Sequence, residues 1–364
     1  SGKSETVSAT LGLYFSDQAP TRRPVMIRLG SKSIDIPAGE REYKFGTEFV
    51  FPADVEILSV YPHAHYLGAS MFADVHMPSG DVERLIEIDQ WDFNWQDDYA
   101  LQTPLAVPEG SRIVMEFTYD NSAGNPRNPH RPPQRVHWGP SSLDEMGDLW
   151  VQVVPRRMAD EQIVRNAASA AMYAQNIDGA RFALTIDPAD ARAHNTLATA
   201  LESQGDVNGA LGHLRAAVQH DPSYAIAHYN LGVLALAKGR RNAARGAFER
   251  TLELHPSHAG AGLNLGSLLA EANQLNRAAE LTRNVIAVRP SAQAHYNLGV
   301  IELRQDEFDR AIASFEAALA YDGERAEIYS NLGVAHLSTG DLDRARSSLE
   351  RATALDPTSA SGRH

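Results

Sequence analysis

Residues 230–256 read NLGVLALAKGRRNAARGAFERTLELHP, and the pattern of this stretch recurs through the second half of the chain. The triplet Asn-Leu-Gly stands at residues 230–232, 264–266, 297–299 and 331–333. Prolines mark the same period, 34 residues apart, at Pro188, Pro222, Pro256 and Pro290, with Gly323 in the next position and Pro357 after it. A fixed period of this length in an Ala-, Leu-, Glu- and Arg-rich sequence predicts stacked helical hairpins.

Small and aromatic residues follow the same period. Alanine recurs where paired helices must approach closely, at Ala210, Ala244, Ala278, Ala311 and Ala345, and Phe248 and Phe315 fill a wider gap one turn later. This pattern resembles the tetratricopeptide repeat, a helical hairpin of about 34 residues. The resemblance covers residues 189–357 as five repeats, with residues 158–188 as an irregular helical unit before them and residues 358–364 as a tail.

The resemblance implies a superhelical array whose inner groove holds a protein or peptide. Four asparagines lie in the first helix of successive repeats, the side that lines the groove: Asn230, Asn264, Asn297 and Asn331. A carboxamide both donates and accepts, so this Asn ladder is suited to pair with the backbone of an extended peptide. The alternative is that these side chains hydrogen-bond within the array.

The first half, residues 1–157, has a different pattern. Short segments rich in Val, Ile, Phe, Tyr and Thr alternate with turns such as Pro78-Ser79-Gly80, which is typical of antiparallel sheets in a β sandwich or jelly roll. The predicted strands are residues 11–15, 25–29, 43–51, 55–60, 70–77, 84–88, 112–119 and 149–154. The chain is therefore expected to be multidomain, with a β domain followed by an all-α solenoid.

Residues 120–140 are rich in Pro and Asn and predict a long ordered loop. Side-chain oxygens of Asp120, Asn121 and Asn125 are of the type that binds calcium. The alternative is a loop tied by its own Asx turns.

Two histidines in the first half, His63 and His65, are separated by one residue. On a strand this spacing points both imidazoles to one face, close enough to bind a single metal ion. Around them lie Trp91-Asp92-Phe93-Asn94-Trp95-Gln96, Asp120-Asn121-Ser122, and Trp138 to Trp150 with its Asp144-Glu145-Met146.

These segments resemble the C-terminal half of the copper type II, ascorbate-dependent monooxygenases, the peptidylglycine and dopamine monooxygenase family, and its bacterial members most. The resemblance covers residues 8–156 and implies that His63, His65 and Met146 bind one copper ion. Two imidazoles and a thioether suit Cu(I) and leave a position for dioxygen, with zinc as the second choice of metal. Ascorbate or another donor would supply the electrons.

The sequence also departs from that family. It contains no His-His pair, which the animal enzymes use for a second, electron-supplying copper. A redox domain would therefore be separate or upstream, or this domain no longer performs monooxygenation. The positions matching the family's substrate-binding Arg, Asn and Tyr are Tyr61, Asp148 and Trp150, so a peptide carboxylate clamp is not expected. With no cysteine, the chain also lacks the family's disulfides.

The composition limits the kinds of partner that the chain is expected to bind. The 364 residues include 46 acidic and 33 basic side chains, a net charge of −13, whereas nucleic-acid binding needs a basic surface. No apolar run approaches the ~20 residues of a membrane span. Nucleic acid and membrane insertion are therefore not expected.

The predicted function is a copper-binding monooxygenase-like protein, performing dioxygen-dependent hydroxylation with a redox domain elsewhere, whose repeat array binds a protein. One alternative is a non-catalytic exported scaffold with a structural or relic copper. Another is a subunit that self-assembles through its solenoid ends, as a homo-oligomer or filament. The resemblance implies a bacterial protein exported to the periplasm or beyond, and the start at Ser1 is consistent with processing.

Overall fold

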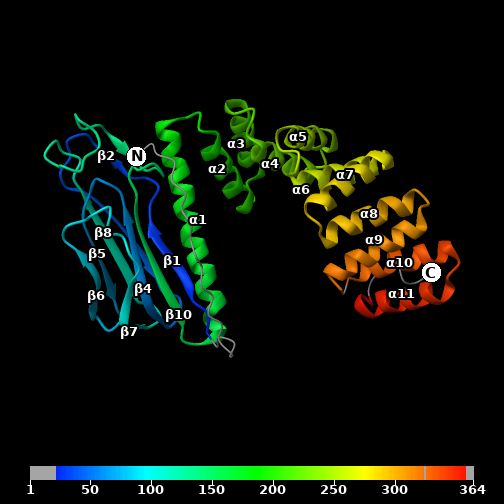
Figure 1. Cartoon of the computed structure of the whole chain (residues 1–364), viewed down its shortest axis with the longest axis horizontal. Coiled ribbons are helices and arrows are strands. Elements are labelled where there is room, and N and C mark those ends of the chain that lie inside the picture. Colours follow the sequence, from blue (N-terminus) through cyan, green and yellow to red (C-terminus); the bar gives the residue numbers. More distant parts are fainter. Residues whose placement is uncertain (1–21, 324, 358–364) are drawn as a thin grey trace, which may run out of the picture. The chain divides into compact units, whose positions relative to one another are not determined.

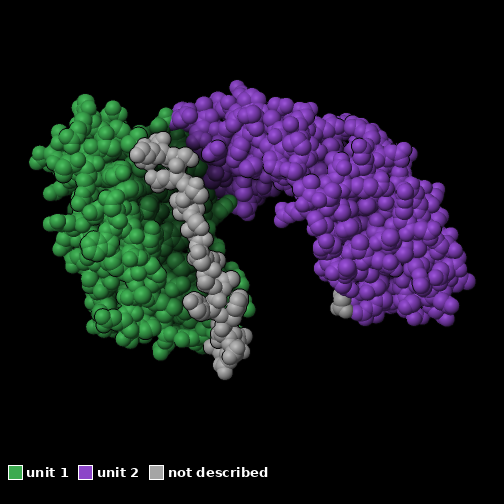
Figure 2. Space-filling model, in the orientation of Figure 1, with its two compact units in different colours: residues 1–186 green, residues 187–364 purple. Residues whose placement is uncertain are grey.

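The computed structural model describes residues 22–323 and 325–357, so the strand predicted at residues 11–15 lies outside them. The chain divides into two compact units, Ser1–Ile186 and Asp187–His364 (Figures 1 and 2). Among the described residues, the first unit holds the strands and one long helix, and the regular structure of the second is all helical. The change of composition near residue 158 thus separates strands from helices, but the first long helix belongs to the first unit.

The first unit contains two four-stranded antiparallel sheets and a short two-stranded ladder. The first sheet has the order β1 (Val25–Gly30), β10 (Gly147–Pro155), β4 (Val55–Ala64), β7 (Tyr99–Val107). The second sheet has the order β3 (Tyr43–Val50), β8 (Arg112–Tyr119), β5 (Gly68–His76), β6 (Val82–Ile88). The ladder joins β2 (Asp35–Ile36) and β9 (Val136–His137). The predicted antiparallel strands are therefore confirmed for residues 22–157.

One hydrophobic core draws on both sheets. Ile57 and Val151 of the first sheet and Met115 and Phe117 of the second are fully buried in it, together with Trp91 from a loop. Alternate residues of each strand supply these side chains, because successive side chains of a strand point to opposite faces. Burial of these faces fixes the register of the strands, and with it the positions of the site residues described below.

Strand β7 was not among the predicted strands, and neither were the two-residue strands β2 and β9. The sequence of β7 includes Pro104, which cannot donate a ladder hydrogen bond and argues against a central strand. The structure places β7 at the edge of the first sheet, where β4 is its only neighbour among the strands of residues 22–157 and proline is tolerated.

Helix α1 (Glu161–Ile186) follows the short helix η1 (Met158–Asp160) and packs on β1 and β10. Val164 is fully buried in the core of the first unit, and Ala167, Ala168 and Ala171 pack against that core. The Gln175 amide donates to the Arg28 carbonyl at 3.3 Å. Residues that the sequence suggests as a lead into the repeat array thus cover one face of the first sheet.

The second unit consists of helical hairpins in series, which confirms the predicted all-helical array (Figure 1). Its helices are α2 (Ala191–Ser203), α3 (Val207–His220), α4 (Ala225–Ala237), α5 (Arg241–Leu254), α6 (Ala259–Glu271), α7 (Leu275–Val288), α8 (Ala292–Arg304), α9 (Phe308–Tyr321), α10 (Ala326–Thr339) and α11 (Leu342–Leu355). None of the helices in the described ranges is both long and apolar enough to cross a bilayer.

Periodic small residues let the two helices of each hairpin pack closely. Ala244 and Ala311 are fully buried where the helices meet. The Phe248 ring lies over Gly232, and the Phe315 ring lies over Gly299, so the glycine of the Asn-Leu-Gly triplet makes room for an aromatic ring. The pattern of the sequence is therefore explained by packing within each hairpin.

Each hairpin turns through one residue with a left-handed backbone. The five positions follow the period of the repeat: Gly205, Gly239, Asn273, Asp306 and Gly340, with φ between 59° and 83°. Only Gly, and to a lesser degree Asn and Asp, adopts this conformation at low cost. The same joint therefore links the two helices of every hairpin.

Replacing Gly232 by Ala is expected to destabilise the array by about 1–3 kcal/mol, because the added Cβ would lie 2.6 Å from Cε1 of Phe248. Gly246→Ala in α5 is the matched control. There the added Cβ meets no described atom within 4 Å, so better helix propensity should stabilise by up to about 1 kcal/mol. Urea unfolding followed by far-UV circular dichroism measures both. Equal effects of the two substitutions would contradict this account.

Candidate functional site

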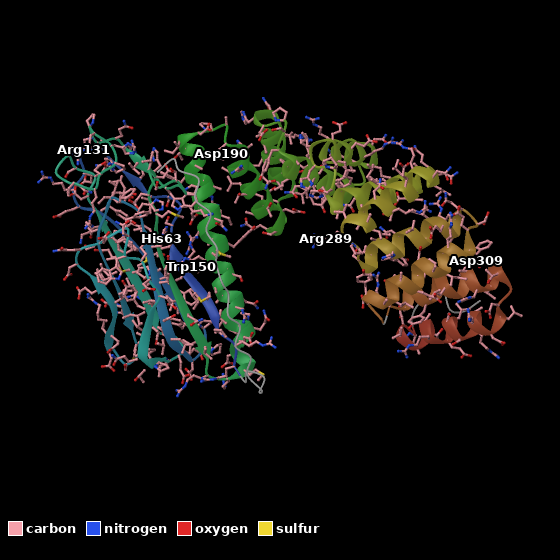
Figure 3. All side chains as sticks on the ribbon, in the orientation of Figure 1. His63, Arg131, Trp150, Asp190, Arg289 and Asp309 are labelled. Atoms are coloured by element: carbon pink, nitrogen blue, oxygen red, sulfur yellow. The ribbon has the colours of Figure 1, made fainter. Side chains whose placement is uncertain are left out.

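The His63–His65 pair lies at the end of β4. His63 is in the strand and His65 directly follows its last residue, Ala64. The two rings are 5.2 Å apart between centroids and nearly perpendicular. His63 is half-buried, and His65 is only 4% exposed. The sequence-predicted pair is thus brought together in a partly enclosed place, and Figure 3 labels His63 in the first unit.

Each imidazole has a hydrogen-bond partner at Nδ1. Nδ1 of His63 lies 2.5 Å from Oε1 of Gln96, and Nδ1 of His65 lies 3.0 Å from the carbonyl oxygen of Asp144. Burial lowers the pKa of His65, and the hydrogen bond to the Asp144 carbonyl opposes that shift. A neutral ring whose Nδ1 carries the proton keeps its lone pair on Nε2, the state in which histidine binds a metal.

Met146 precedes β10, and the register of the sheet places it beside the histidines. Gly147 pairs with Ala64 and Asp148 with His63, so continuing the register by one residue sets Met146 opposite His65. Met146 is half-buried, and its carbonyl accepts a hydrogen bond from the buried Tyr119 hydroxyl at 2.9 Å. The three predicted copper ligands therefore lie on two neighbouring segments at one end of the first sheet.

Glu145 joins these two segments. Its buried carboxylate accepts hydrogen bonds from the backbone N–H groups of His65, Leu67 and Met146, the last two at 2.9 Å. Burial raises the pKa of Glu145 to about 7, although these three N–H groups oppose the shift. One side chain thus holds the turn after β4 against the residue that precedes β10.

The other predicted residues, Tyr61, Asp148 and Trp150, lie next to His63 on the same strand pair. Asp148 pairs with His63, and Trp150 pairs with Tyr61. Opposite residues of an antiparallel pair share a face, and the intervening Leu149 points into the core. These side chains therefore form one row with His63 on the face that is turned away from the second sheet.

A buried ion pair stabilises this row. Arg28 of β1 donates to Asp148 at 2.8 Å, and the two side chains are 8% and 5% exposed. The guanidinium also lies 5.9 Å from the centroid of the Trp150 ring (Trp150 is labelled in Figure 3). Burial raises the pKa of Asp148, and Arg28 opposes that shift. Asp148, a residue that the sequence suggests for the substrate side, is thus paired with a cation of this chain.

Sequence reasoning missed three residues of this site: Gln96, Glu145 and Arg28. Gln96 and Glu145 stand inside the segments that carry the copper monooxygenase resemblance, so their place in the sequence was the available signal. Arg28 gave no such signal, because its partner is 120 residues away. Within residues 22–323 and 325–357, no group of three His, Asp or Glu side chains is arranged to hold a metal ion.

The loop at residues 120–140 is tied by hydrogen bonds of its own side chains. The Asp120 carboxylate accepts from the Ser122 N–H at 2.9 Å, and the Asn125 amide donates to the Asp120 carbonyl at 2.7 Å. The Asn121 amide donates to the Gln134 carbonyl at 2.7 Å. Calcium binding at these residues stays a prediction.

In the second unit, the Asn ladder crosses the first helices of successive hairpins. Asn230 donates to Asn195 at 2.9 Å, Asn297 to Ser267 at 3.4 Å, and Asn331 to Tyr296 at 3.2 Å. Each acceptor lies on the first helix of the preceding hairpin. Asn264 is likewise half-buried, on α6. These bonds link neighbouring repeats, and each carboxamide has a second N–H for another acceptor.

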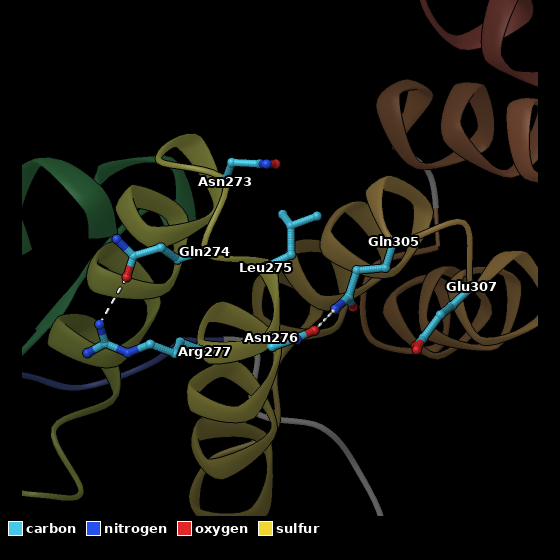
Figure 4. A pocket seen from close by; sticks show the side chains of 7 residues that line it. All are labelled: Asn273, Gln274, Leu275, Asn276, Arg277, Gln305 and Glu307. Atoms are coloured by element: carbon cyan, nitrogen blue, oxygen red, sulfur yellow. Dashed lines mark hydrogen bonds between the residues drawn. The ribbon is translucent and has the colours of Figure 1, made fainter.

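A surface hollow of about 570 Å³ lies in the array between the turns of two neighbouring hairpins (Figure 4). Four of its polar side chains pair with one another. Arg277 donates to Gln274 at 2.9 Å, and Gln305 donates to Asn276 at 2.7 Å. The hollow is open, and four of its side chains are engaged in these two bonds, so no ligand is proposed for it.

Three histidines gather in the first hairpin of the array. Nδ1 of His194 lies 2.8 Å from Nδ1 of His213, and the His220 ring stacks on His194 at 5.8 Å. One proton must lie between the two Nδ1 atoms, so the pair cannot hold two positive charges in this geometry. Burial, followed by the charge of His194, lowers the pKa of His213.

The array is therefore expected to lose stability as the pH falls below about 6.5, the ordinary histidine value, because the unfolded chain then binds a proton that folded His213 does not. The loss should end below the folded pKa of His213. His213→Gln should reduce this pH dependence, while His228→Gln, a histidine of the next hairpin, should retain it. Urea unfolding between about pH 5 and 8, the range in which histidine titrates, measures the pH dependence of stability in both variants and the wild type. An unchanged dependence in His213→Gln would refute the assignment.

The serial hairpins, with their Asn ladder, define a helical repeat protein of the solenoid class. The family model described as the tetratricopeptide repeat matches residues 165–225, 195–259, 229–283, 263–313 and 302–360, which together span more than half of the chain. The chain belongs to the tetratricopeptide repeat family. The first match begins within α1.

Several solved structures are similar to this chain, and one of them is described as a TPR protein. YrrB, a TPR protein with an unusual peptide-binding site, is 22% identical with a TM-score of 0.47, covering 50% of this chain and 95% of its own. MamA from Desulfovibrio magneticus RS-1 is 22% identical with a TM-score of 0.43, and the match covers 47% of this chain and 97% of MamA. The pilF protein of Pseudomonas aeruginosa is 20% identical with a TM-score of 0.48, and the match covers 56% of this chain and 93% of pilF. No curated protein matches the chain.

Proposed function

We propose that this chain is a binding scaffold whose repeat array holds an extended segment of a partner protein along the Asn ladder. Membership of the tetratricopeptide repeat family supports a role in protein interaction. The observation that carries the finer proposal is the row of half-buried carboxamides on α4, α6, α8 and α10. Each has capacity for a further hydrogen bond to a peptide backbone.

Selection of peptides from a random library against the full chain, followed by affinity measurement, tests this proposal. The double variant Asn264→Ala/Asn297→Ala should lose about 10-fold or more in affinity, since each lost hydrogen bond costs about 0.5–1.5 kcal/mol. Asn242→Ala, an exposed asparagine of α5, is the matched control and should bind like the wild type. Equal affinity of the double variant and the wild type would refute the ladder as the binding surface.

A second function is proposed for the first unit, which is binding of one copper ion by His63, His65 and Met146. Its support is the hydrogen bonding of both Nδ1 atoms, which leaves the Nε2 lone pairs for a metal, and the register that sets Met146 opposite His65. Two imidazoles and a thioether are a donor set for Cu(I), and zinc is the second choice. Copper when bound would supply dioxygen activation for hydroxylation of a carbon, with electrons from ascorbate or another donor through a separate or upstream redox domain.

The protein's own residues have definite parts in this proposal. Glu145 holds the segments of His65 and Met146 together, and the Arg28–Asp148 pair keeps the Asp148 carboxyl group in place beside His63. The Phe93 ring makes an edge-to-face contact with His65, 5.9 Å between centroids, and would limit the access of water to a bound metal. The exported location belongs to the same proposal, because it rests on the same resemblance.

Anaerobic titration with Cu(I) under a competing chelator tests the copper proposal. The wild type should bind one equivalent, and His63→Ala and Met146→Ala should each bind at least 10-fold more weakly. His76→Ala, a histidine of β5, is the matched control and should leave the affinity unchanged. Wild-type affinity no greater than that of the ligand variants would refute the site, and a preference for Zn²⁺ would replace copper by zinc.

Self-assembly through the array is a further candidate. Val334 and Leu337 of α10 are 45% and 49% exposed, whereas their counterparts one repeat earlier, Val300 and Leu303, pack against a buried cluster. An apolar helix face of this kind can dock on a second copy. Sedimentation velocity should show larger species at higher concentration, and fewer of them in Val334→Glu/Leu337→Glu. A concentration-independent monomer would exclude this candidate.

A further inference from the structure

The segment Trp91–Gln96, which reads WDFNWQ, folds over the histidine pair. Its first residue, Trp91, is anchored in the core and only 1% exposed. The backbone N–H of Trp91 donates to the Ala69 carbonyl at 2.8 Å, and the centroid of its ring lies 5.6 Å from that of Phe117. The chain then turns on Asp92, whose carboxylate accepts from the Asn94 N–H at 3.0 Å. Anchor and turn together fix the position of the residues that follow.

Two side chains of this segment reach the histidines. The Phe93 ring contacts His65 edge to face at 5.9 Å and lies 4.4 Å from the Tyr66 ring. The Gln96 carboxamide lies beside His63, with its oxygen 2.5 Å from Nδ1. One short segment thus contacts both members of the pair.

The orientation of the Gln96 carboxamide follows from its second hydrogen bond. Its other terminal atom lies 2.7 Å from the carbonyl oxygen of Phe93. A carbonyl only accepts, so the atom facing it must be the NH₂ group, and the atom facing His63 must be the oxygen. That oxygen also only accepts, so Nδ1 of His63 must be the donor.

We propose that Gln96 is a positioning residue that holds His63 in the tautomer with the proton on Nδ1, and thereby presents Nε2 to the metal site. The backbone carbonyl of Asp144 does the same for His65, at 3.0 Å from its Nδ1. The use of this tautomer rests on the proposed copper function, whereas the tautomer itself is a property of the metal-free chain. Outer residues of this kind fix both the ring orientation and the basicity of a histidine ligand.

The first test is NMR spectroscopy of the metal-free full chain with ¹⁵N- and ¹³C-labelled histidine, at a pH where the rings are neutral. The His63 signals, identified by their loss in His63→Gln, should report the proton on Nδ1. Gln96→Leu should shift them to a mixture of tautomers or to the other tautomer. Gln96→Glu keeps an acceptor and should restore the wild-type tautomer. Gln90→Leu, an exposed glutamine beside the same segment, is the matched control.

Cu(I) titration of the same variants gives the second test. Gln96→Leu should bind about 10- to 100-fold more weakly than the wild type, with recovery in Gln96→Glu. A His63 proton on Nε2 in the wild type, or an unchanged tautomer in Gln96→Leu, would overturn the positioning role even if copper binds. The expected tautomers with no Cu(I) binding by the wild type would support the role of Gln96 and refute the copper function.

Discussion

Phe248→Ala is expected to lower the free energy of unfolding of the repeat array by about 3–5 kcal/mol. Phe248 is fully buried between α4 and α5, with its ring over Gly232 and 5.9 Å from the Tyr229 ring. Removing the ring leaves a cavity that the glycine opposite cannot fill. Because each repeat is stabilised by its neighbours, unfolding should also become less cooperative.

Urea unfolding of the full chain, followed by far-UV circular dichroism, measures this loss, since the array contributes most of the helix. Phe308→Ala is the control, because it removes the same ring from α9 at a half-buried position. It should cost clearly less than Phe248→Ala. If both substitutions cost the same, the aromatic position of the repeat is not what holds the hairpin together.

Arg28→Met is expected to destabilise the first unit by about 3–5 kcal/mol, because it leaves the Asp148 carboxylate buried without its cation. The Asp148 carboxyl group is packed tightly against Gly30, because a Cβ added at Gly30 would lie 2.1 Å from Oδ1 of Asp148. The side chain therefore has little space there to move away from its buried position. Tryptophan fluorescence isolates this unit, because all four tryptophans of the chain lie between Trp91 and Trp150.

The double variant Arg28→Met/Asp148→Leu separates the charge effect from simple loss of packing. Replacing both partners of a buried ion pair by apolar residues of similar size is often neutral or stabilising, so the double variant should recover most of the loss. A double variant less stable than Arg28→Met alone would show that the pair is needed for its shape and hydrogen bonds. The circular dichroism transition of the array serves as an internal reference.

The repeat array could be predicted from the sequence almost completely, because its contacts are local. Ala244, Phe248 and Gly232 meet within one hairpin, so their spacing along the chain reports their contact directly. The longer described strands of the first unit were predictable from alternation, apart from β7, where edge position permits Pro104. The two-residue strands β2 and β9 are too short for alternation to show.

The site was predictable only in part. His63 and His65 are neighbours in sequence, and strand geometry alone sets them on one face. Gln96, Glu145 and Arg28 reach the site from segments 33, 80 and 120 residues away from their partners His63, His65 and Asp148. Such contacts depend on the sheet order, β1-β10-β4-β7, which no local pattern reports. The docking of α1 on this sheet was missed for the same reason.

The recurring left-handed joint at Gly205, Gly239, Asn273, Asp306 and Gly340 gives the two units different evolutionary freedom. A whole repeat carries its own joint and packs mainly on the repeats beside it, so in-frame duplication or deletion of one repeat leaves the others intact. The first unit has no such freedom, because β1 pairs with β10 although most of the unit's sequence lies between these two strands. The number of repeats in the array can therefore change during evolution, whereas the histidine site requires all strands of the first unit together.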